Sequence, residues 1–249
     1  FKNVHFTYPG ADTPSLKGLS FKINKGETVA VVGKNGAGKT TFVKLLLRFY
    51  DPDSGVILYN GTDIREYDIK SLHQRLATVF QDYKVFALTV NENVLCRETA
   101  DDSDLTTVDN ALKSAGIYER IMSLPEQKET VFTREFDEKG TWLSGGEQQR
   151  VSIARAVAKQ PTMLLCDEPT GALDSKTGVL ILNLLQDMSN NQNTTVVIVT
   201  HNAILAEAAD KVIRIKNGQI ENIRGMGEKV MLRYNEWQLP EGAKTESFY

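Results

Sequence analysis

Gly33-Lys34-Asn35-Gly36-Ala37-Gly38-Lys39-Thr40 fits the pattern G-x-x-x-x-G-K-[ST] at each fixed position. The segment follows the apolar run 29–32, and it precedes the stretch 41–49, where apolar residues recur at helical spacing. A strand, a glycine-rich turn and a helix in this order predict a phosphate-binding loop, because backbone N–H groups and the helix start both attract anions. We expect Lys39 to reach the β- and γ-phosphates of a nucleotide and Thr40 to hold Mg²⁺. The alternative is a glycine-rich turn with a structural role only.

Short apolar strands and amphipathic helices alternate on both sides of this loop. A helical stretch is expected from about residue 85 to residue 158, and hairpins are expected at Asn60-Gly61 and at Asn217-Gly218. This β-α-β order predicts an α/β fold with a largely parallel sheet covered by helices, a helical insert and an antiparallel N-terminal layer. The strands are expected at 4–8, 19–23, 29–32, 76–80, 163–166 and 195–199.

Length and charge exclude several classes of protein. The 249 residues correspond to one large domain, or to one domain with a grafted subdomain. Lys and Arg number 29 against 32 Asp and Glu, so the formal net charge of −3 gives no support to a nucleic-acid partner. No apolar run approaches the length of about 18 residues that a membrane span needs, and no signal peptide is visible. Because the sequence starts at Phe1, we expect it to be part of a longer protein whose other part can hold a membrane domain.

Three further residues are assigned packing roles. The two cysteines, Cys96 and Cys166, are too few for a disulfide framework, and they favour a reducing compartment. We expect both of them to pack in the core, as small hydrophobic residues do. Trp142 is likewise expected to be a packing residue.

Two acidic residues end the apolar strand 163–166. In open α/β sheets ligands bind at the carboxyl ends of the strands, which is where Asp167 and Glu168 are expected to lie. Asp167 can support Mg²⁺, directly or through water, and we assign Glu168 to polarise the attacking water. The alternative is a pair of solvated carboxylates at the sheet edge, which would be favoured without the phosphate loop.

Three more motifs have both a functional and a structural interpretation. Residues 143–147, Leu-Ser-Gly-Gly-Glu, form a turn before a helix, where Ser144 and Glu147 on their own favour a capping box. His201 closes the strand expected beside the Asp167 strand and can bond a γ-phosphate, although a loop histidine satisfied by its neighbours is the more common case. Gln81 ends the strand 76–80 and can sense the metal or the water, unless it is an edge glutamine with no role.

The ordered set of motifs resembles the ATP-binding domain of ABC transporters, over residues 1 to about 221. The resemblance implies an α/β fold: a P-loop NTPase (RecA-like) core with an antiparallel β subdomain and a helical subdomain that carries the ABC signature. The domain would span 1–223, with the helical subdomain inserted at about 85–158, and 224–249 would be a C-terminal tail or linker. The motifs are Tyr8, 33–40, Gln81, 143–147, 163–168, 171–174 and His201.

The resemblance also implies a role for each motif. Tyr8 would stack on adenine, and the loop would hold the phosphates of ATP through Gly33, Asn35, Gly36, Ala37, Gly38, Lys39, Thr40 and Thr41. Thr40, Asp167 and Gln81 would hold Mg²⁺, while Glu168, His201 and Gln81 would serve catalysis. In the family's arrangement the ATP site of a second copy is completed by Ser144, Gly145, Gly146, Glu147 and Asp174.

Partners and location follow from the same resemblance. It implies an ATPase that powers a membrane transporter, of the exporter type, by closing head to tail on a second such domain, identical or different. The domain would lie at the cytoplasmic face of the cell membrane, with no nucleic acid as partner. Two rival functions stay open: a soluble ABC-type ATPase that acts on nucleic acid or ribosomes, and a catalytically silent nucleotide-sensing adaptor. The presence of Glu168 and His201 argues against the silent adaptor.

The two halves of the chain differ in style. Residues 1–146 resemble exporters whose membrane and ATP domains share one chain. From about residue 148 onward, the run 165–178 and the run 197–202 resemble the ATPases of lipoprotein-release and macrolide-efflux systems. A chimera and ordinary divergence both explain this difference.

Overall fold

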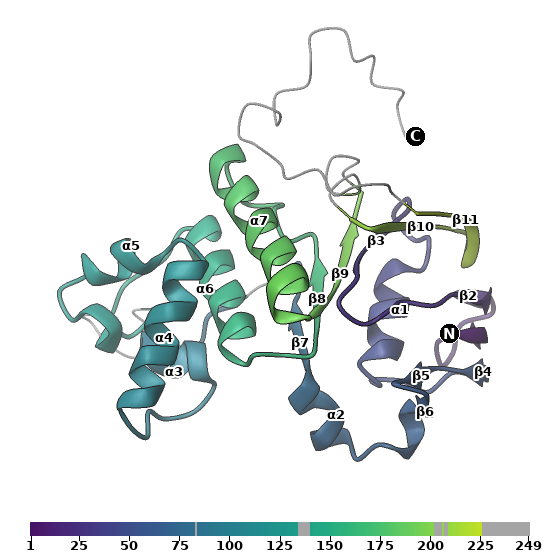
Figure 1. The fold of residues 1–249 in the computed structure, drawn as a ribbon, viewed down its shortest axis with the longest axis horizontal. Helices are drawn as coiled ribbons and strands as arrows, with labels where there is room; N and C mark the ends of the chain where they lie inside the picture. Colours follow the sequence, from purple (N-terminus) through teal and green to yellow (C-terminus); the bar gives the residue numbers. More distant parts are fainter. Residues whose placement is uncertain (83, 134–139, 202–205, 207–208, 226–249) are drawn as a thin grey trace, which may run out of the picture.

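The computed structural model describes residues 1–82, 84–133, 140–201, 206 and 209–225. Figure 1 shows strands β7, β8 and β9 between two groups of elements. Helices α3 to α6 lie on one side, and helix α1 with strands β1, β2 and β4 lies on the other. The prediction of an α/β fold with a helical insert and an N-terminal β layer is confirmed.

The central sheet has six strands in the order β11-β10-β3-β9-β8-β7. All neighbouring pairs are parallel except β10 and β11, which form the hairpin expected at Asn217-Gly218. Every residue of β3 and β9 is buried, as a strand covered on both faces requires. The strands are β3 (Thr28–Val32), β7 (Leu76–Val79), β8 (Met163–Asp167), β9 (Thr195–Thr200), β10 (Lys211–Lys216) and β11 (Gln219–Gly225).

Successive residues of each central strand belong to different cores, because side chains alternate between the two faces of a sheet. Leu164 and Cys166 pack into the cluster that includes the helical insert. Leu165 packs into the other cluster, together with Phe42 of helix α1 (Lys39–Leu46). The sheet therefore joins the helical subdomain to the phosphate loop through one continuous set of strands.

The N-terminal layer is antiparallel, as predicted, but three boundaries in this region were wrong. It consists of β1 (Lys2–Phe6), β2 (Leu16–Leu19) and β4 (Ser54–Val56), followed by the hairpin of β5 (Leu58–Tyr59) and β6 (Thr62–Asp63) and by the helices η1 (Ile64–Glu66) and α2 (Ile69–Arg75). The strands expected at 4–8 and 19–23 lie at 2–6 and 16–19 instead. The helix expected to reach Phe49 ends at Leu46, because Arg48 adopts a left-handed conformation with φ 55°, which leaves Phe49 51% exposed.

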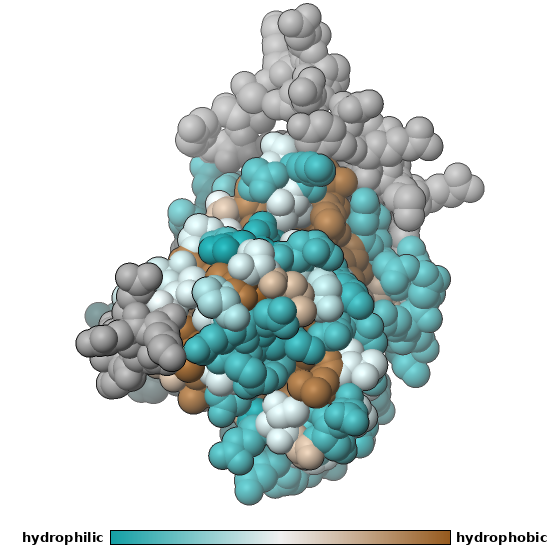
Figure 2. All heavy atoms as spheres, turned by 90° about the vertical axis from the view of Figure 1, so that its left-hand side faces the viewer, coloured by the Kyte–Doolittle hydropathy of each residue, from teal (hydrophilic) through white to brown (hydrophobic). Residues whose placement is uncertain are grey.

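The helical subdomain consists of α3 (Val90–Leu95), α4 (Asp102–Ser114), α5 (Tyr118–Met122), η2 (Gln127–Glu129) and α6 (Gly145–Ala158). Its helices pack on one another and on β7 around a buried apolar core. Helix α7 (Ser175–Gln192) follows β8 and packs on β9. Figure 2 shows the end of the molecule formed by this subdomain as mostly hydrophilic, with smaller hydrophobic patches.

Two of the three packing assignments were wrong. Cys166 is buried in β8, as predicted, whereas Cys96 is exposed at the end of α3 in a left-handed conformation. Trp142 is 57% exposed. Local sequence does not report exposure at such loop positions, because neighbouring elements decide it.

The end of the described chain belongs to the sheet. β11 runs to Gly225, so Arg224 and Gly225 are strand residues, and 226–249 lie outside the described residues. Within the described residues, no helix is both long enough and apolar enough to cross a bilayer.

Candidate functional site

The predicted phosphate loop connects β3 to α1. Gly38 is the N-cap residue of α1 with φ 108°, a conformation that a residue with a side chain rarely adopts, and no side chain caps the helix. The uncapped N–H groups of the first turn therefore stay available for an anion, and they carry the positive end of the helix dipole.

Lys39 lies folded back over this loop. Its side chain is buried, and its Nζ donates to the carbonyl oxygens of Gly33 at 2.6 Å and Lys34 at 3.1 Å. The ammonium is thus held within the loop by the loop's own backbone. An anion bound to the loop would meet this charge directly.

Asp167 and Glu168 lie at the carboxyl end of β8, as predicted. Asp167 is 8% exposed, and its pKa is raised by burial and by the charge of Glu168, against the opposing effect of Lys39. None of the described hydrogen bonds reaches its carboxylate. A buried carboxylate near a phosphate loop, without a protein donor, fits a Mg²⁺ ligand, because Mg²⁺ is commonly bound through one or two carboxylates plus phosphate oxygens.

Glu168 turns its side chain toward the end of β9. Its Oε1 accepts from the backbone N of His201 at 2.9 Å and lies 2.7 Å from His201 Nδ1, and its Oε2 accepts from Thr200 Oγ1 at 3.0 Å. The Glu168 backbone has φ 51°, in the left-handed region. The His201 side chain is 75% exposed, so it can turn away from the carboxylate. The structure thus brings Glu168 and His201 together through the pairing of β8 with β9.

Tyr8 lies beside the first turn of α1. Its Oη is 3.2 Å from Thr41 Oγ1, and its ring is packed edge-on against Tyr50 with centroids 5.3 Å apart. Lys44 Nζ lies 5.4 Å from the centre of the same ring. The aromatic ring predicted to contact adenine is therefore anchored next to the phosphate loop, while the buried Thr41 serves as its support.

Residues 144–147 start helix α6, and the capping box is present. Glu147 N donates to Ser144 Oγ at 3.4 Å, and Ser144 N donates to Glu147 Oε2 at 2.7 Å. Burial would raise the pKa of Glu147, but hydrogen bonds from Ser144 and Arg120 outweigh it and lower the pKa. Ser144 and Gly145 are exposed, and no described hydrogen bond or ion pair joins them to the loop 33–40. The turn is both a helix cap and an accessible surface.

Two other predicted residues lie at element ends. Asp174 is exposed and caps α7, accepting from Thr177 N at 3.0 Å and Thr177 Oγ1 at 2.7 Å. These hydrogen bonds lower its pKa. Gln81 follows β7 shortly after its last residue and is exposed. Since β7 pairs with β8, Gln81 follows the strand that neighbours Asp167.

Sequence reasoning missed two residues of this site. Thr200, the last residue of β9, bonds the Glu168 carboxylate. Gln149 of α6 is 1% exposed and bonds the backbone after β8. A signal for Gln149 was present, because it is a polar residue four positions before the buried Ile153, on the buried face of the helix.

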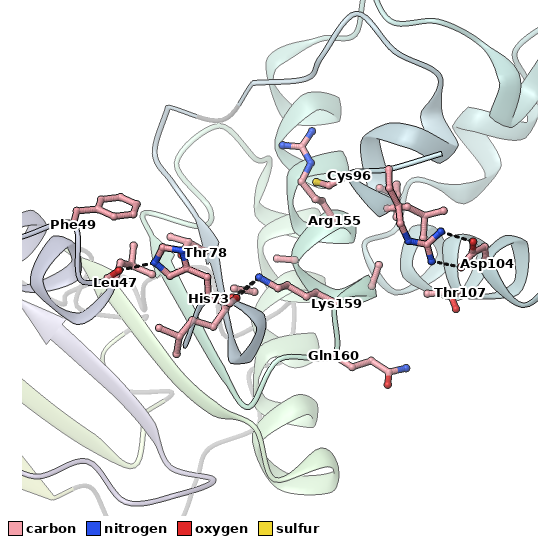
Figure 3. Close-up of a pocket in the computed structure, with 17 residues that line it drawn as sticks. Leu47, Phe49, His73, Thr78, Cys96, Asp104, Thr107, Arg155, Lys159 and Gln160 are labelled. Carbon is pink, nitrogen blue, oxygen red and sulfur yellow. Dashed lines mark hydrogen bonds and ion pairs between the residues drawn. The ribbon is translucent and has the colours of Figure 1, made fainter. Parts of the chain in front are cut away.

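A separate cavity of about 660 Å³ lies between the end of α1, the α2–β7 region, and helices α3 and α6 (Figure 3). Lys159 points toward the backbone of His73 there, and it also donates to Leu76 O at 2.8 Å. Arg155 lies 4.7 Å from the centre of the Phe86 ring. Burial lowers the pKa of both cations. No residue of the loop 33–40 lines this cavity, so it is distinct from the phosphate site.

The fold and the loop together define a P-loop ATPase: an anion-binding turn at the end of a parallel strand, with a buried acid and a second carboxylate at the neighbouring strand end. The family model described as ABC transporter matches residues 16–171, and the chain belongs to this family. It is an ATP-binding domain of the ABC transporter type, which hydrolyses ATP with Mg²⁺ as the metal partner.

Known relatives match nearly the whole chain. The ATP-dependent lipid A-core flippase of Escherichia coli is 37% identical over 220 residues, which are 88% of this chain and 37% of that protein. ABC transporter B family member 3 of Dictyostelium discoideum is 38% identical over 234 residues, 94% of this chain and 16% of that protein. The chain therefore spans well under half the length of these relatives.

Two solved structures have the same fold. A bacterial Atm1-family ABC exporter with ATP bound is 37% identical with a TM-score of 0.81, over 91% of this chain and 38% of that one. The dimeric post-hydrolysis structure of the ATP-binding cassette MJ0796, bound to ADP and Pi, is 30% identical with a TM-score of 0.77, over 91% of this chain and 98% of that one. The predicted family, with its exporter-like similarity, is confirmed, whereas the special likeness of the second half to lipoprotein-release ATPases stays a prediction.

Proposed function

We propose that this domain binds MgATP in the loop 33–40 and hydrolyses it with Glu168 as general base, in order to drive export through a membrane domain. The observation that carries the proposal is the convergence of Lys39, Asp167, Glu168 and His201 at one edge of the sheet. A phosphate loop alone binds nucleotides, whereas the added carboxylate and histidine are groups that act on a terminal phosphate.

Residues of the loop and the sheet edge would hold the metal. We assign the ligands Thr40 and Asp167, with Gln81 contacting the metal or the water. When bound, Mg²⁺ neutralises charge on the β- and γ-phosphate oxygens. Lys39 would exchange its two carbonyl partners for phosphate oxygens, which form stronger, charge-assisted hydrogen bonds.

Both carboxylate oxygens of Glu168 already accept hydrogen bonds, and Oε1 lies near two nitrogens of His201, so movement of the His201 side chain would free Oε1 for a water. A γ-phosphate would attract the His201 side chain away from Oε1 and make room for a water. The water oxygen then forms a bond to the γ-phosphorus, and the bond from the γ-phosphorus to the β–γ bridging oxygen breaks. The proton of the water passes to Glu168, and ADP leaves with the electron pair of the broken bond. Tyr8 would stack on the adenine of the same nucleotide.

A second copy would complete the site. Ser144 and Gly145 are exposed and separate from this chain's own loop, so they can cover the nucleotide of a partner domain, with Gly146 and Glu147 behind them. Asp174, exposed at the start of α7, would bridge the two domains. The dimeric neighbour structure bound to ADP and Pi supports such a pair. The partner is an identical or a related ATP-binding domain.

The transmembrane partner would dock at the cavity of Figure 3. Phe49 on its rim and the nearby Phe86 are each 51% exposed, so two large apolar side chains beside the cavity are open to a partner. We assign this surface to a cytoplasmic segment of the membrane domain. The domain would then lie at the cytoplasmic face of the membrane, and the similarity to an ABC exporter of solved structure supports outward transport.

The dimer can be tested by light scattering with MgATP. Glu168→Gln should form a dimer, because nucleotide stays bound when hydrolysis stops. Adding Ser144→Arg should abolish the dimer, since the new side chain fills the surface that faces the partner's nucleotide. Thr106→Arg, on an exposed position of α4, is the matched control and should dimerise. If Ser144→Arg dimerises like the control, the turn is only a helix cap.

A further inference from the structure

Gln149 connects helix α6 to the carboxyl end of β8, where Glu168 lies. Its Nε2 donates to the carbonyl oxygen of Glu168 at 3.2 Å, and its Oε1 accepts from the backbone N of Ala172 at 3.3 Å. Gln149 is 1% exposed, so its own amide has no water as a ready substitute for these two partners. One amide thus bridges both ends of the turn that follows β8.

A second contact joins the same two segments. A Cβ on Gly146 would lie 3.1 Å from the carbonyl oxygen of Ala172. The backbone N of Ala172 therefore donates to Gln149, and its carbonyl oxygen leaves little room for a side chain at position 146. Gly146 belongs to the turn 143–147, here called the signature turn, so this turn and residues 168–172 are close neighbours.

The Glu168 backbone is the part of this turn that needs support. Its φ of 51° is unfavourable for a residue with a side chain. Its carbonyl oxygen accepts from Gly171 N at 3.1 Å as well as from Gln149. These two hydrogen bonds fix the peptide plane after Glu168, and hence the direction in which its carboxylate leaves the strand.

We propose that Gln149 is a positioning residue that couples the two ATP sites of the dimer. In the proposed dimer, the signature turn contacts the nucleotide bound by the partner, and Glu168 acts on the nucleotide bound by this chain. Gln149 would therefore transmit the closing of the signature turn on the partner's nucleotide to the base at this chain's own site. The inference rests on the proposed function. It predicts that hydrolysis is cooperative in ATP, and that this cooperativity depends on the two hydrogen bonds of Gln149.

The test uses Gln149→Met, which keeps the length of the side chain and removes both hydrogen bonds. We expect kcat to fall by about 10- to 100-fold, as for a slightly misplaced catalytic group, with the Hill coefficient for ATP approaching 1. The affinity for fluorescent MgATP should stay within about twofold of wild type, because the loop 33–40 is unchanged. Gln186→Met is the matched control, since Gln186 is also a buried glutamine and lies three turns into α7.

Two further measurements keep the proposal falsifiable. In the Glu168→Gln background, Gln149→Met should still dimerise with MgATP, because Ser144 and Gly145 are intact. If Gln149→Met does not fold, Gln149→Glu replaces it; this variant keeps the acceptor for Ala172 N, loses the donor to Glu168 O, and should also lower kcat and the Hill coefficient.

The inference is wrong if the Gln149 variants keep wild-type kcat and cooperativity, if Gln186→Met loses kcat to the same extent, or if Gln149→Met abolishes the dimer. A wild-type domain that hydrolyses no ATP would instead refute the proposed function. The two failures are therefore distinguishable.

Discussion

Replacing Glu168 by glutamine removes the proposed base and keeps the shape of the side chain. We expect turnover to fall by about 10²- to 10⁴-fold, the usual contribution of general base catalysis. At about 1.36 kcal/mol per tenfold change in rate, this corresponds to about 2.7–5.4 kcal/mol in the activation barrier. The barrier rises because the attacking water has no group to take its proton.

The folded structure should tolerate this substitution. A glutamine can place its amide oxygen at Oε1, where it accepts from His201 N and can accept from His201 Nδ1, and it can donate to Thr200 Oγ1 with its amide nitrogen, so all three contacts of Glu168 can persist. The hydrogen bonds become neutral, which costs about 0.5–1.5 kcal/mol relative to those of the carboxylate. For a domain of this size, that corresponds to a decrease in Tm of about 1–6 °C.

The assay combines phosphate release, titration with fluorescent MgATP and thermal unfolding. Glu98→Gln, on an exposed residue of the helical subdomain, controls for loss of one negative charge and should match wild type in all three. Turnover of Glu168→Gln within tenfold of wild type would refute the assignment of the base. Loss of MgATP binding would show instead that Glu168 supports the site and not the chemical step.

Three other substitutions have distinct expected outcomes. Lys39→Ala should weaken MgATP binding by about 10- to 100-fold in a fluorescence titration, since it removes charged hydrogen bonds of about 1.5–3 kcal/mol; an unchanged Kd would move the phosphate site elsewhere. Asp167→Asn should raise the Tm of the nucleotide-free domain at pH 7 and weaken its Mg²⁺ dependence. Burial and the Glu168 charge raise the pKa of Asp167, so the ionised carboxylate destabilises the folded domain at pH 7. The gain in Tm from Asp167→Asn should therefore vanish at pH values below the ordinary pKa range of an aspartate, where the carboxyl group is protonated in both the folded and the unfolded chain. Asp104→Asn should lower Tm by a few degrees at pH 7, because Arg97 holds the pKa of Asp104 at about 2, and the difference should disappear as the pH falls from about 4 to 2. Constant Tm differences across pH would refute the last two arguments.

Much of the site could be predicted because its residues follow buried strands. Apolar runs such as 29–32 and 163–166 are typical of strands covered on both faces, and parallel strands bring their carboxyl ends to one edge. Asp167, Glu168 and His201 therefore had to lie near one another once β8 and β9 were neighbours. The contact of Glu168 with His201 follows from pairing and not from any local property of either residue.

The errors lie where local pattern and burial disagree. Phe21 is buried but lies outside β2, so the apolar alternation at 19–23 belongs to a covered loop and not to a strand. For Gln149 the element was predicted but the contacts were not. Its amide bonds backbone groups about 20 residues further along the chain, and nothing in the sequence of α6 indicates which ones. Such contacts depend on the packing of separate elements, which periodicity does not encode.

The crystal structure of Glu168→Gln with MgATP tests the central claim most directly. We expect the triphosphate in the loop 33–40, with Lys39 on the terminal phosphates and Ser144 of a second copy over the same nucleotide. A structure with that loop empty and the nucleotide bound at another surface, such as the cavity beside Phe49, would contradict the proposed site and the mechanism that depends on it.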